Sequence, residues 1–157
     1  MTQMKFIILT VILIALVIIS GCTKAAPPTD NSELSKTKIT ILKTSGCGCC
    51  GIYSQYAQKQ GLDVTIKIDD NLDSIKDGYK IPLDMRSCHT TQIENYFVEG
   101  HVPIEAIEKM MVEQPDIAGI ALPGMPSGAP GMPGSKSGTW TVYAINHDGS
   151  TFEFIKI

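Results

Sequence analysis

Residues 38–68, KITILKTSGCGCCGIYSQYAQKQGLDVTIKI, decide the fold of this chain. Residues 38–43 place Ile39 and Ile41 on one face, which predicts a short strand. The segment 44–46, Thr-Ser-Gly, then signals a turn that leads straight into three cysteines. The stretch therefore predicts a strand that ends at a cysteine-bearing turn.

A helix and a second strand follow this turn. Residues 51–60 carry apolar side chains at helical spacing, and Gly61 provides a C-terminal stop. The spaced residues are Ile52, Tyr53, Tyr56 and Ala57. Residues 63–69 alternate apolar and polar side chains, which predicts a strand. The order is strand, cysteine turn, helix, strand.

The rest of the chain predicts an α/β fold with a mixed sheet and flanking helices. Asn71 can cap a short helix that runs through Ile75 and stops at Gly78, and Pro82 can start one further turn. The later elements are an irregular segment at 86–90, a hairpin over 91–102 with its bend at 94–95, a helix over 104–113, a Pro/Gly/Met loop over 122–138, and a C-terminal β-hairpin of 139–146 and 151–157.

The N-terminus predicts export. Lys5 precedes an apolar run over residues 6–19, which is shorter than the roughly 20 residues of a spanning helix. The sequence from Ile19 to Cys22 resembles a bacterial-type lipobox, although leucine is commoner at the position of Ile19. The resemblance implies that Cys22 is acylated and holds the protein at the cell membrane, facing the extracytoplasmic side. An uncleaved N-terminal anchor is the alternative, and it places the chain outside the cytoplasm too.

Three regions follow from these features. Residues 1–21 are predicted to be a lipoprotein signal peptide, residues 22–38 the acylated cysteine with a flexible tether, and residues 39–157 one domain. The formal net charge is only -3 and no Lys/Arg block interleaves with aromatic residues, which argues against nucleic-acid binding.

The cysteines are clustered rather than spread out. Besides Cys22 the chain has four, and Cys47, Cys49 and Cys50 lie within four residues, which favours chemistry over structural disulfides. Cys47 and Cys50 form a C-x-x-C pair between a strand and a helix, a setting typical of a thioredoxin-like redox or metal site where helix N–H groups stabilise thiolates. The third cysteine suits a soft metal such as Cu(I), or else Zn(II), better than a dithiol redox cycle.

Four motifs resemble the DUF411 family. They are TSGCGCCG at 44–51, SCHT at 87–90, VEGHVP at 98–103, and PGMP at 123–126 with PGM at 130–132. The resemblance runs in order through the domain from Ile39 to Ile157. It implies a thioredoxin-like fold and a metal-binding, copper-related role.

Cys88 and His89 are predicted to join the cysteine turn. In a thioredoxin-like sheet the loop entering the third strand passes close to that turn, and residues 87–90 occupy this place in the element order. Cys88 and His89 could then complete a three- or four-coordinate site facing Cys47 and Cys50. The alternatives are a buried apolar Cys88 and a His89 that only forms hydrogen bonds.

The remaining histidines and the methionines divide into two groups. We expect a structural role for His101, exposure for His147 at a hairpin tip, and core packing for Met110 and Met111. Two methionines lie in the Pro/Gly loop, where a thioether is a soft ligand suited to Cu(I); the alternative is that they pack on the domain surface. These are Met125 and Met132.

Three hypotheses result. The first is a lipid-anchored carrier or store of Cu(I), with zinc as the other metal considered and with an unidentified copper-protein partner. The second is a thiol-disulfide oxidoreductase in which Cys47 attacks and Cys50 resolves. The third has the cysteines only bracing the fold, but bridges within residues 47–50 would close loops of little entropic value.

Overall fold

The computed structural model describes residues 34–157. The signal peptide, the lipidation of Cys22 and the tether as far as residue 33 lie outside these residues. Within residues 34–157, no helix combines the length and the apolar character needed to cross a membrane.

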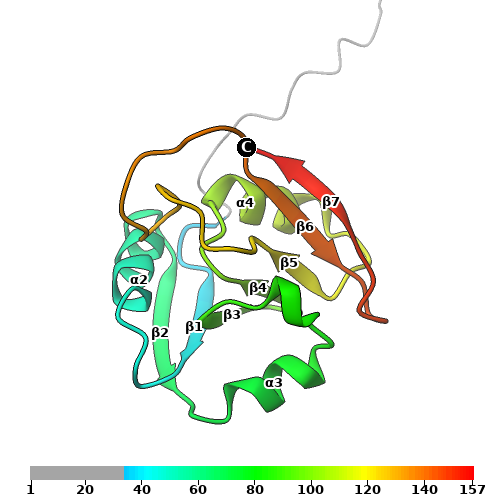
Figure 1. The fold of residues 1–157 in the computed structure, drawn as a ribbon, viewed down its shortest axis with the longest axis horizontal. Coiled ribbons are helices and arrows are strands. Elements are labelled where there is room, and N and C mark those ends of the chain that lie inside the picture. Colours follow the sequence, from blue (N-terminus) through cyan, green and yellow to red (C-terminus); the bar gives the residue numbers. More distant parts are fainter. Residues whose placement is uncertain (1–33) are drawn as a thin grey trace, which may run out of the picture. The chain divides into compact units, whose positions relative to one another are not determined.

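A seven-stranded mixed sheet forms the centre of the domain, in the order β2-β1-β3-β4-β5-β6-β7 (Figure 1). The elements are β1 (Lys38–Lys43), α2 (Cys50–Lys59), β2 (Asp63–Ile68), α3 (Leu72–Gly78), a 3₁₀ turn η1 (Leu83–Met85), β3 (His89–Ile93), β4 (Tyr96–Glu99), α4 (Ile104–Glu113), β5 (Gly119–Ala121), β6 (Thr141–Ile145) and β7 (Thr151–Lys156). Strand β1 pairs in parallel with β2 and antiparallel with β3, which pairs antiparallel with β4. This confirms the predicted α/β, thioredoxin-like arrangement of β1-α2-β2 followed by β3-β4-α4.

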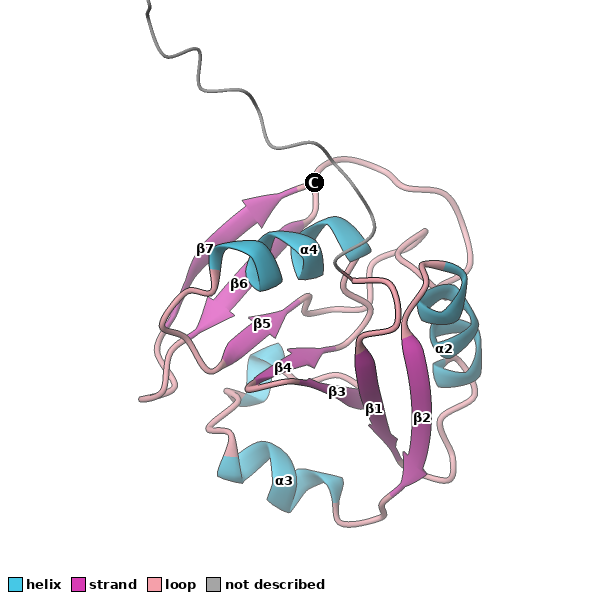
Figure 2. Ribbon diagram, turned by 180° about the vertical axis from the view of Figure 1, so that it is seen from behind, coloured by secondary structure: helices cyan, strands magenta, loops and turns pink. Residues whose placement is uncertain are grey.

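The sheet extends beyond that unit on the β4 side. Strand β5 pairs in parallel with β4, and β6 and β7 add the predicted C-terminal hairpin (Figure 2). Strand β5 was not predicted, because a three-residue Gly-Ile-Ala strand is too short to show alternation. As predicted, no helix or strand lies within residues 122–138.

The start of the domain and the start of β3 differ from the predictions. Residues 34–38 were assigned to the tether, but Leu34 is 4% exposed and packs in the core, and Lys36 N–H donates to the Gly61 carbonyl at 2.8 Å. Residues 86–90 were predicted to be irregular throughout, but β3 begins at His89 because His89 and Thr90 pair with the end of β1.

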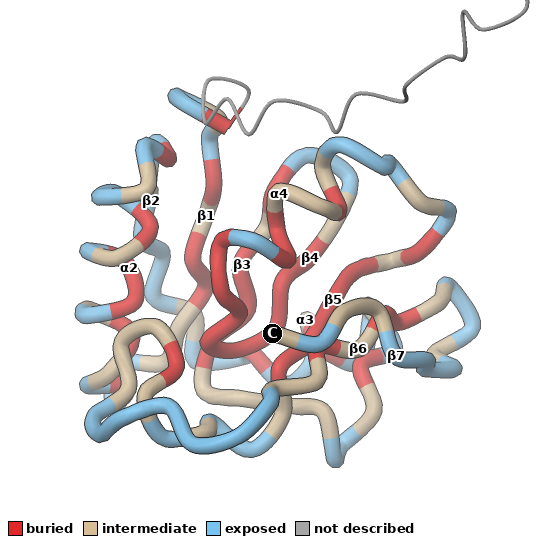
Figure 3. Tube along the Cα trace, turned by 90° about the horizontal axis from the view of Figure 1, so that it is seen from above, coloured by how far each residue is buried: buried red, intermediate tan, exposed pale blue. Residues whose placement is uncertain are grey.

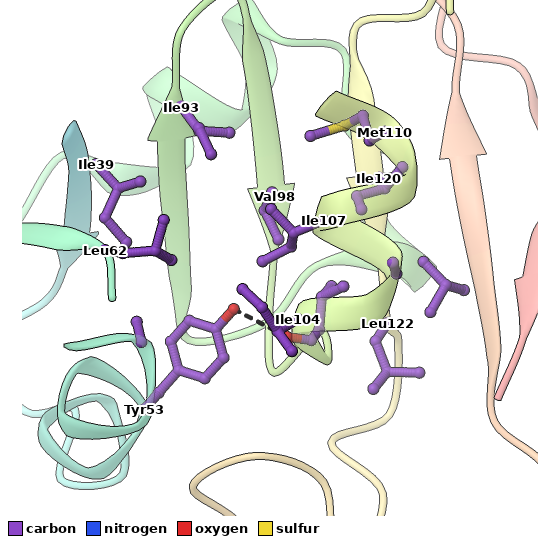
Figure 4. Packing of buried hydrophobic residues seen from close by; sticks show 14 of the residues in the cluster. Ile39, Tyr53, Leu62, Ile93, Val98, Ile104, Ile107, Met110, Ile120 and Leu122 are labelled. Atoms are coloured by element: carbon purple, nitrogen blue, oxygen red, sulfur yellow. Dashed lines mark hydrogen bonds between the residues drawn. The ribbon is translucent and has the colours of Figure 1, made fainter. Parts of the chain in front are cut away.

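The sheet packs apolar side chains on both faces. Val98 and Ile120 lie in a large core with residues of α2 and α4, whereas Phe97 and Ala121 lie in a smaller core with Ile81. Successive strand residues point to opposite faces, which explains the division. Figure 4 shows α4 side chains, including Met110, against the large core. Met110 is fully buried and Met111 packs beside it, as predicted. Burial is almost continuous along β3, β4 and β5 (Figure 3).

Candidate metal centre

Three segments meet at one end of the sheet. Lys43, the last residue of β1, pairs with His89, the first residue of β3, so the cysteine turn after β1 lies beside Cys88. Thr90 pairs with Glu99, the last residue of β4, which brings the chain after β4 to the same end. The antiparallel register therefore gathers residues that are up to 54 positions apart, from Cys47 to His101.

Cys88 is at the centre of the cluster. Its Sγ lies 3.4 Å from Sγ of Cys49 and 3.7 Å from Sγ of Cys50. It also lies 3.7 Å from Nδ1 of His89 and 4.0 Å from Nε2 of His101. Thiolate sulfur and imidazole nitrogen are the donors that Cu(I) and Zn(II) take in proteins.

The donors form two overlapping groups. Cys47, Cys50, Cys88 and His89 place their donor atoms within 4.8 Å of one another, and so do Cys49, Cys88 and His101. Only Cys88 belongs to both groups. The structure thus brings together all five Cys and His residues of the predicted metal site and adds His101.

Cys47 and Cys50 are joined by a disulfide in this structure, while Cys49 and Cys88 are free thiols. A disulfide sulfur carries no thiolate charge, so reduction of this bond is needed before either residue can act as a thiolate ligand. The C-x-x-C pair therefore carries two chemistries, thiol-disulfide exchange and, once reduced, metal ligation.

One side of the cysteine turn is open. A side chain placed at Gly46, Gly48 or Gly51 would meet nothing within 4 Å. Cys47 and Cys50 are buried, but Cys49 and Cys88 are partly exposed. An ion can therefore reach the cluster through these two sulfurs.

His101 was expected to be structural, and the geometry instead places it at the cluster. Its Nδ1–H donates to the carbonyl oxygen of Pro130 at 2.7 Å, which leaves the lone pair of Nε2 on the side of Cys88. A second hydrogen bond of this kind is the usual way in which proteins orient a metal-binding histidine. The face assignment assumed that the strand continued from Tyr96 to His101, but β4 ends at Glu99 and Gly100 has a φ of +77°. The sequence feature that could have indicated a site role for His101 is its position in the motif VEGHVP at 98–103.

His89 is fully buried and neutral. Burial, followed by the charges of His101 and Lys76, lowers its pKa to about 3. Its Nδ1 is directed at Cys88, whereas Nε2 has no hydrogen-bond partner among residues 34–157. Burial also lowers the pKa of His101. Both imidazoles are in the neutral form that binds metals.

Burial has the opposite consequence for Cys88. It raises the pKa of the Cys88 thiol to about 11, and the adjacent Cys49 contributes in the same direction. With the disulfide in place and no metal bound, the protein therefore holds Cys88 as a neutral thiol at neutral pH. A bound cation has to displace that proton.

Tyr53 packs beneath both histidines. Its ring centroid lies 4.7 Å from that of His89 and 5.5 Å from that of His101. Its hydroxyl donates to the carbonyl oxygen of Val102 at 3.0 Å, the dashed line in Figure 4. One side chain of α2 thus packs against both imidazole rings.

The loop methionines are placed differently from each other. Met132 packs against the large core, and Met125 is 41% exposed with a φ of +45°. A ligand role for either sulfur stays a prediction. His147 is exposed, as expected, and lies 3.2 Å from a carboxylate oxygen of Asp116.

Gly131 offers a test of the loop over the cluster. A Cβ at Gly131, where φ is +81°, would lie 2.8 Å from the backbone nitrogen of Tyr53. Gly131→Val should therefore displace Pro130 and remove the hydrogen bond to His101. We expect the free energy of unfolding in urea to fall by about 1–3 kcal/mol and metal affinity to fall with it.

Gly138→Val is the matched control, because Gly138 has a φ of +76° but a Cβ added there would meet nothing within 4 Å. It carries the backbone strain alone and should leave metal affinity unchanged. Equal metal affinities for the two variants would contradict the assigned role of the Pro130 carbonyl.

Similarity to a family model and to solved structures identifies the family of this chain. A family model described as "Protein of unknown function, DUF411" matches residues 85–132, which include Cys88, His89 and His101. Two solved structures described as copper resistance protein CopG, forms 1 and 2, share 32% sequence identity with this chain. They superpose with TM-scores of 0.71 and 0.72, covering 78% of this chain and 98% and 99% of theirs. No curated protein matches the sequence. The motifs, the fold and the likeness over nearly the whole length of both CopG structures agree, and the chain belongs to the DUF411 family.

Proposed function

We propose that this protein binds Cu(I) through the cysteine-histidine cluster and serves copper handling or resistance outside the cytoplasm. The observation that carries the proposal is the pair of donor groups that share Cys88. Sulfur donors outnumber nitrogen donors there, which suits a soft cation. The similar CopG structures bear the description "copper resistance protein", which supports copper over zinc.

The site's construction supports binding rather than turnover of a substrate. The donors are held by the ends of three strands, and the two histidines are buried and neutral. The open side at Gly48 and the partly exposed Cys49 give a route by which a partner copper protein can exchange ligands with the cluster. In the proposal, a lipid on Cys22 keeps this route at the outer face of the membrane.

Metal analysis tests the proposal. The chain from Thr23 onward, reduced and purified without added metal, is titrated with Cu(I) and with Zn(II) in competition, and X-ray absorption counts sulfur and nitrogen ligands. We expect Cu(I) to displace Zn(II), with sulfur as the main ligand and nitrogen as the minor one. A folded, reduced protein that binds no Cu(I) would refute the proposal.

The disulfide of Cys47 and Cys50 favours a second candidate, thiol-disulfide exchange. In the reduced protein the Cys47 thiolate would attack a substrate disulfide, and Cys50 would then release the substrate as two thiols while the disulfide re-forms. The N-terminus of α2 at Cys50 favours the thiolate. Catalysed reduction of insulin that is lost in Cys47→Ser, in protein stripped of metal, would support this candidate; inertness would exclude it.

A further inference from the structure

A buried ion pair lies next to the proposed copper centre. The Nζ of Lys76, from α3, contacts Oε1 of Glu99 at the end of β4. Their side chains are 2% and 0% exposed. Charged groups are rarely buried to this degree, because removing them from water costs several kcal/mol per ion.

Both members of the pair hold the segment that carries Cys88 and His89. The backbone N–H of Ser87 donates to Oε1 of Glu99 at 2.6 Å, and Nζ of Lys76 donates to the Ser87 carbonyl at 2.5 Å. On the other side of the segment, Oγ1 of Thr90 donates to Oε2 of Glu99 at 2.6 Å. The residues immediately before Cys88 and after His89 are therefore fixed by the same carboxylate.

The chain after Glu99 is packed against the same segment. Gly100 N–H donates to the His89 carbonyl at 3.2 Å. A Cβ at Gly100 would lie 3.0 Å from Cβ of Ser87, so only glycine fits without displacement. His101 follows directly, and its position therefore depends on the place of Ser87.

A buried ion pair is weak evidence for stability, since apolar side chains of similar volume often replace one without loss. The hydrogen bonds of this ion pair go to Ser87 and Thr90, the two residues that flank Cys88 and His89. We propose that Lys76 and Glu99 are positioning residues that hold Cys88, His89 and His101 in register with the cysteine turn. The inference rests on the proposed function for its first readout, which is Cu(I) affinity. Its second readout, the reactivity of the Cys88 thiol in metal-free protein, does not depend on that function.

The test compares ion-pair replacements in the full chain. Lys76→Met with Glu99→Leu removes both charges and the hydrogen bonds that these two side chains make with Ser87 and Thr90. We expect Cu(I) affinity to fall by about 10–100-fold, the range seen when outer-shell partners of metal ligands are changed. Lys76→Met with Glu99→Gln keeps an amide oxygen for Ser87 N–H and should recover part of the affinity; it also serves if the first variant does not fold.

The matched control is Lys109→Met with Glu113→Leu, which removes an exposed ion pair of the same residue types on α4, with 2.5 Å between Nζ and Oε1. It should leave Cu(I) affinity unchanged. A folded ion-pair variant with the affinity of the unchanged protein would overturn the inference.

The second readout needs no metal. In reduced, metal-free protein, the rate at which iodoacetamide alkylates Cys88, measured on its peptide by mass spectrometry, should rise several-fold in the Lys76 and Glu99 variants and not in the control. If the unchanged protein binds no Cu(I), the proposed function fails, and this rate alone decides the positioning role. An unchanged rate in a folded variant would refute that role.

Discussion

Cys88→Ser is expected to weaken Cu(I) binding by roughly a thousandfold or more, well beyond the 10–100-fold effect of outer-shell changes. Cys88 is the one residue that belongs to both donor groups, and its sulfur lies within 4.0 Å of donors from four other residues. Serine keeps the shape of the side chain but replaces a soft sulfur with a hard oxygen. Competition with a Cu(I) chelator under reducing conditions measures the loss.

Cys49→Ser provides the comparison for this variant. Cys49 belongs only to the group with Cys88 and His101, so its loss leaves all four donors of the other group in place. We expect Cys49→Ser to lose less Cu(I) affinity than Cys88→Ser. The thermal midpoint of the metal-free protein should be unchanged in both variants. Equal losses would show that the two groups do not act as the geometry suggests.

Tyr53→Ala is expected to lower the free energy of unfolding by about 3–5 kcal/mol, the range for removing a large buried aromatic ring. Tyr53 is 1% exposed and packs in the large core. Its ring also separates α2 from the imidazoles of His89 and His101, so a cavity there would let both rings tilt. Urea denaturation of metal-free, reduced protein measures the stability.

Tyr53→Phe separates the ring from its hydroxyl. It keeps the packing and removes only the hydrogen bond to the Val102 carbonyl, which should cost about 1 kcal/mol and leave Cu(I) affinity close to that of the unchanged protein. If phenylalanine proved as damaging as alanine, the ring contacts would not be what stabilises this region.

The fold was predictable where local patterns are long. The strand, cysteine turn, helix and strand over residues 38–68 follow from alternation, helical spacing and Gly61, and the structure confirms them. Strand β5 and the first residues of β3 were not predictable, because their conformation is imposed by pairing with neighbouring strands. The burial of Leu34 likewise depends on contacts distant in sequence.

The site was predictable in its cysteines and in the order of its elements. Placing Cys88 and His89 opposite the cysteine turn needed only the position of the third strand, and the structure brings them there. His101 was assigned a structural role because the strand was assumed to extend past Glu99. The pairing of Lys76 with Glu99 joins residues 23 positions apart, and no local pattern signals it.

The spacing of the ligands along the chain has a consequence for biosynthesis. Cys49 and Cys88 are separated by 39 positions, and His101 lies 13 positions after Cys88. While the ribosome has produced only the first β-α-β unit, the thiols of the turn have no Cys88 or imidazole beside them. The complete donor set comes into being only when the hairpin of β3 and β4 docks on β1, so a peptide copied from the cysteine turn cannot reproduce the centre.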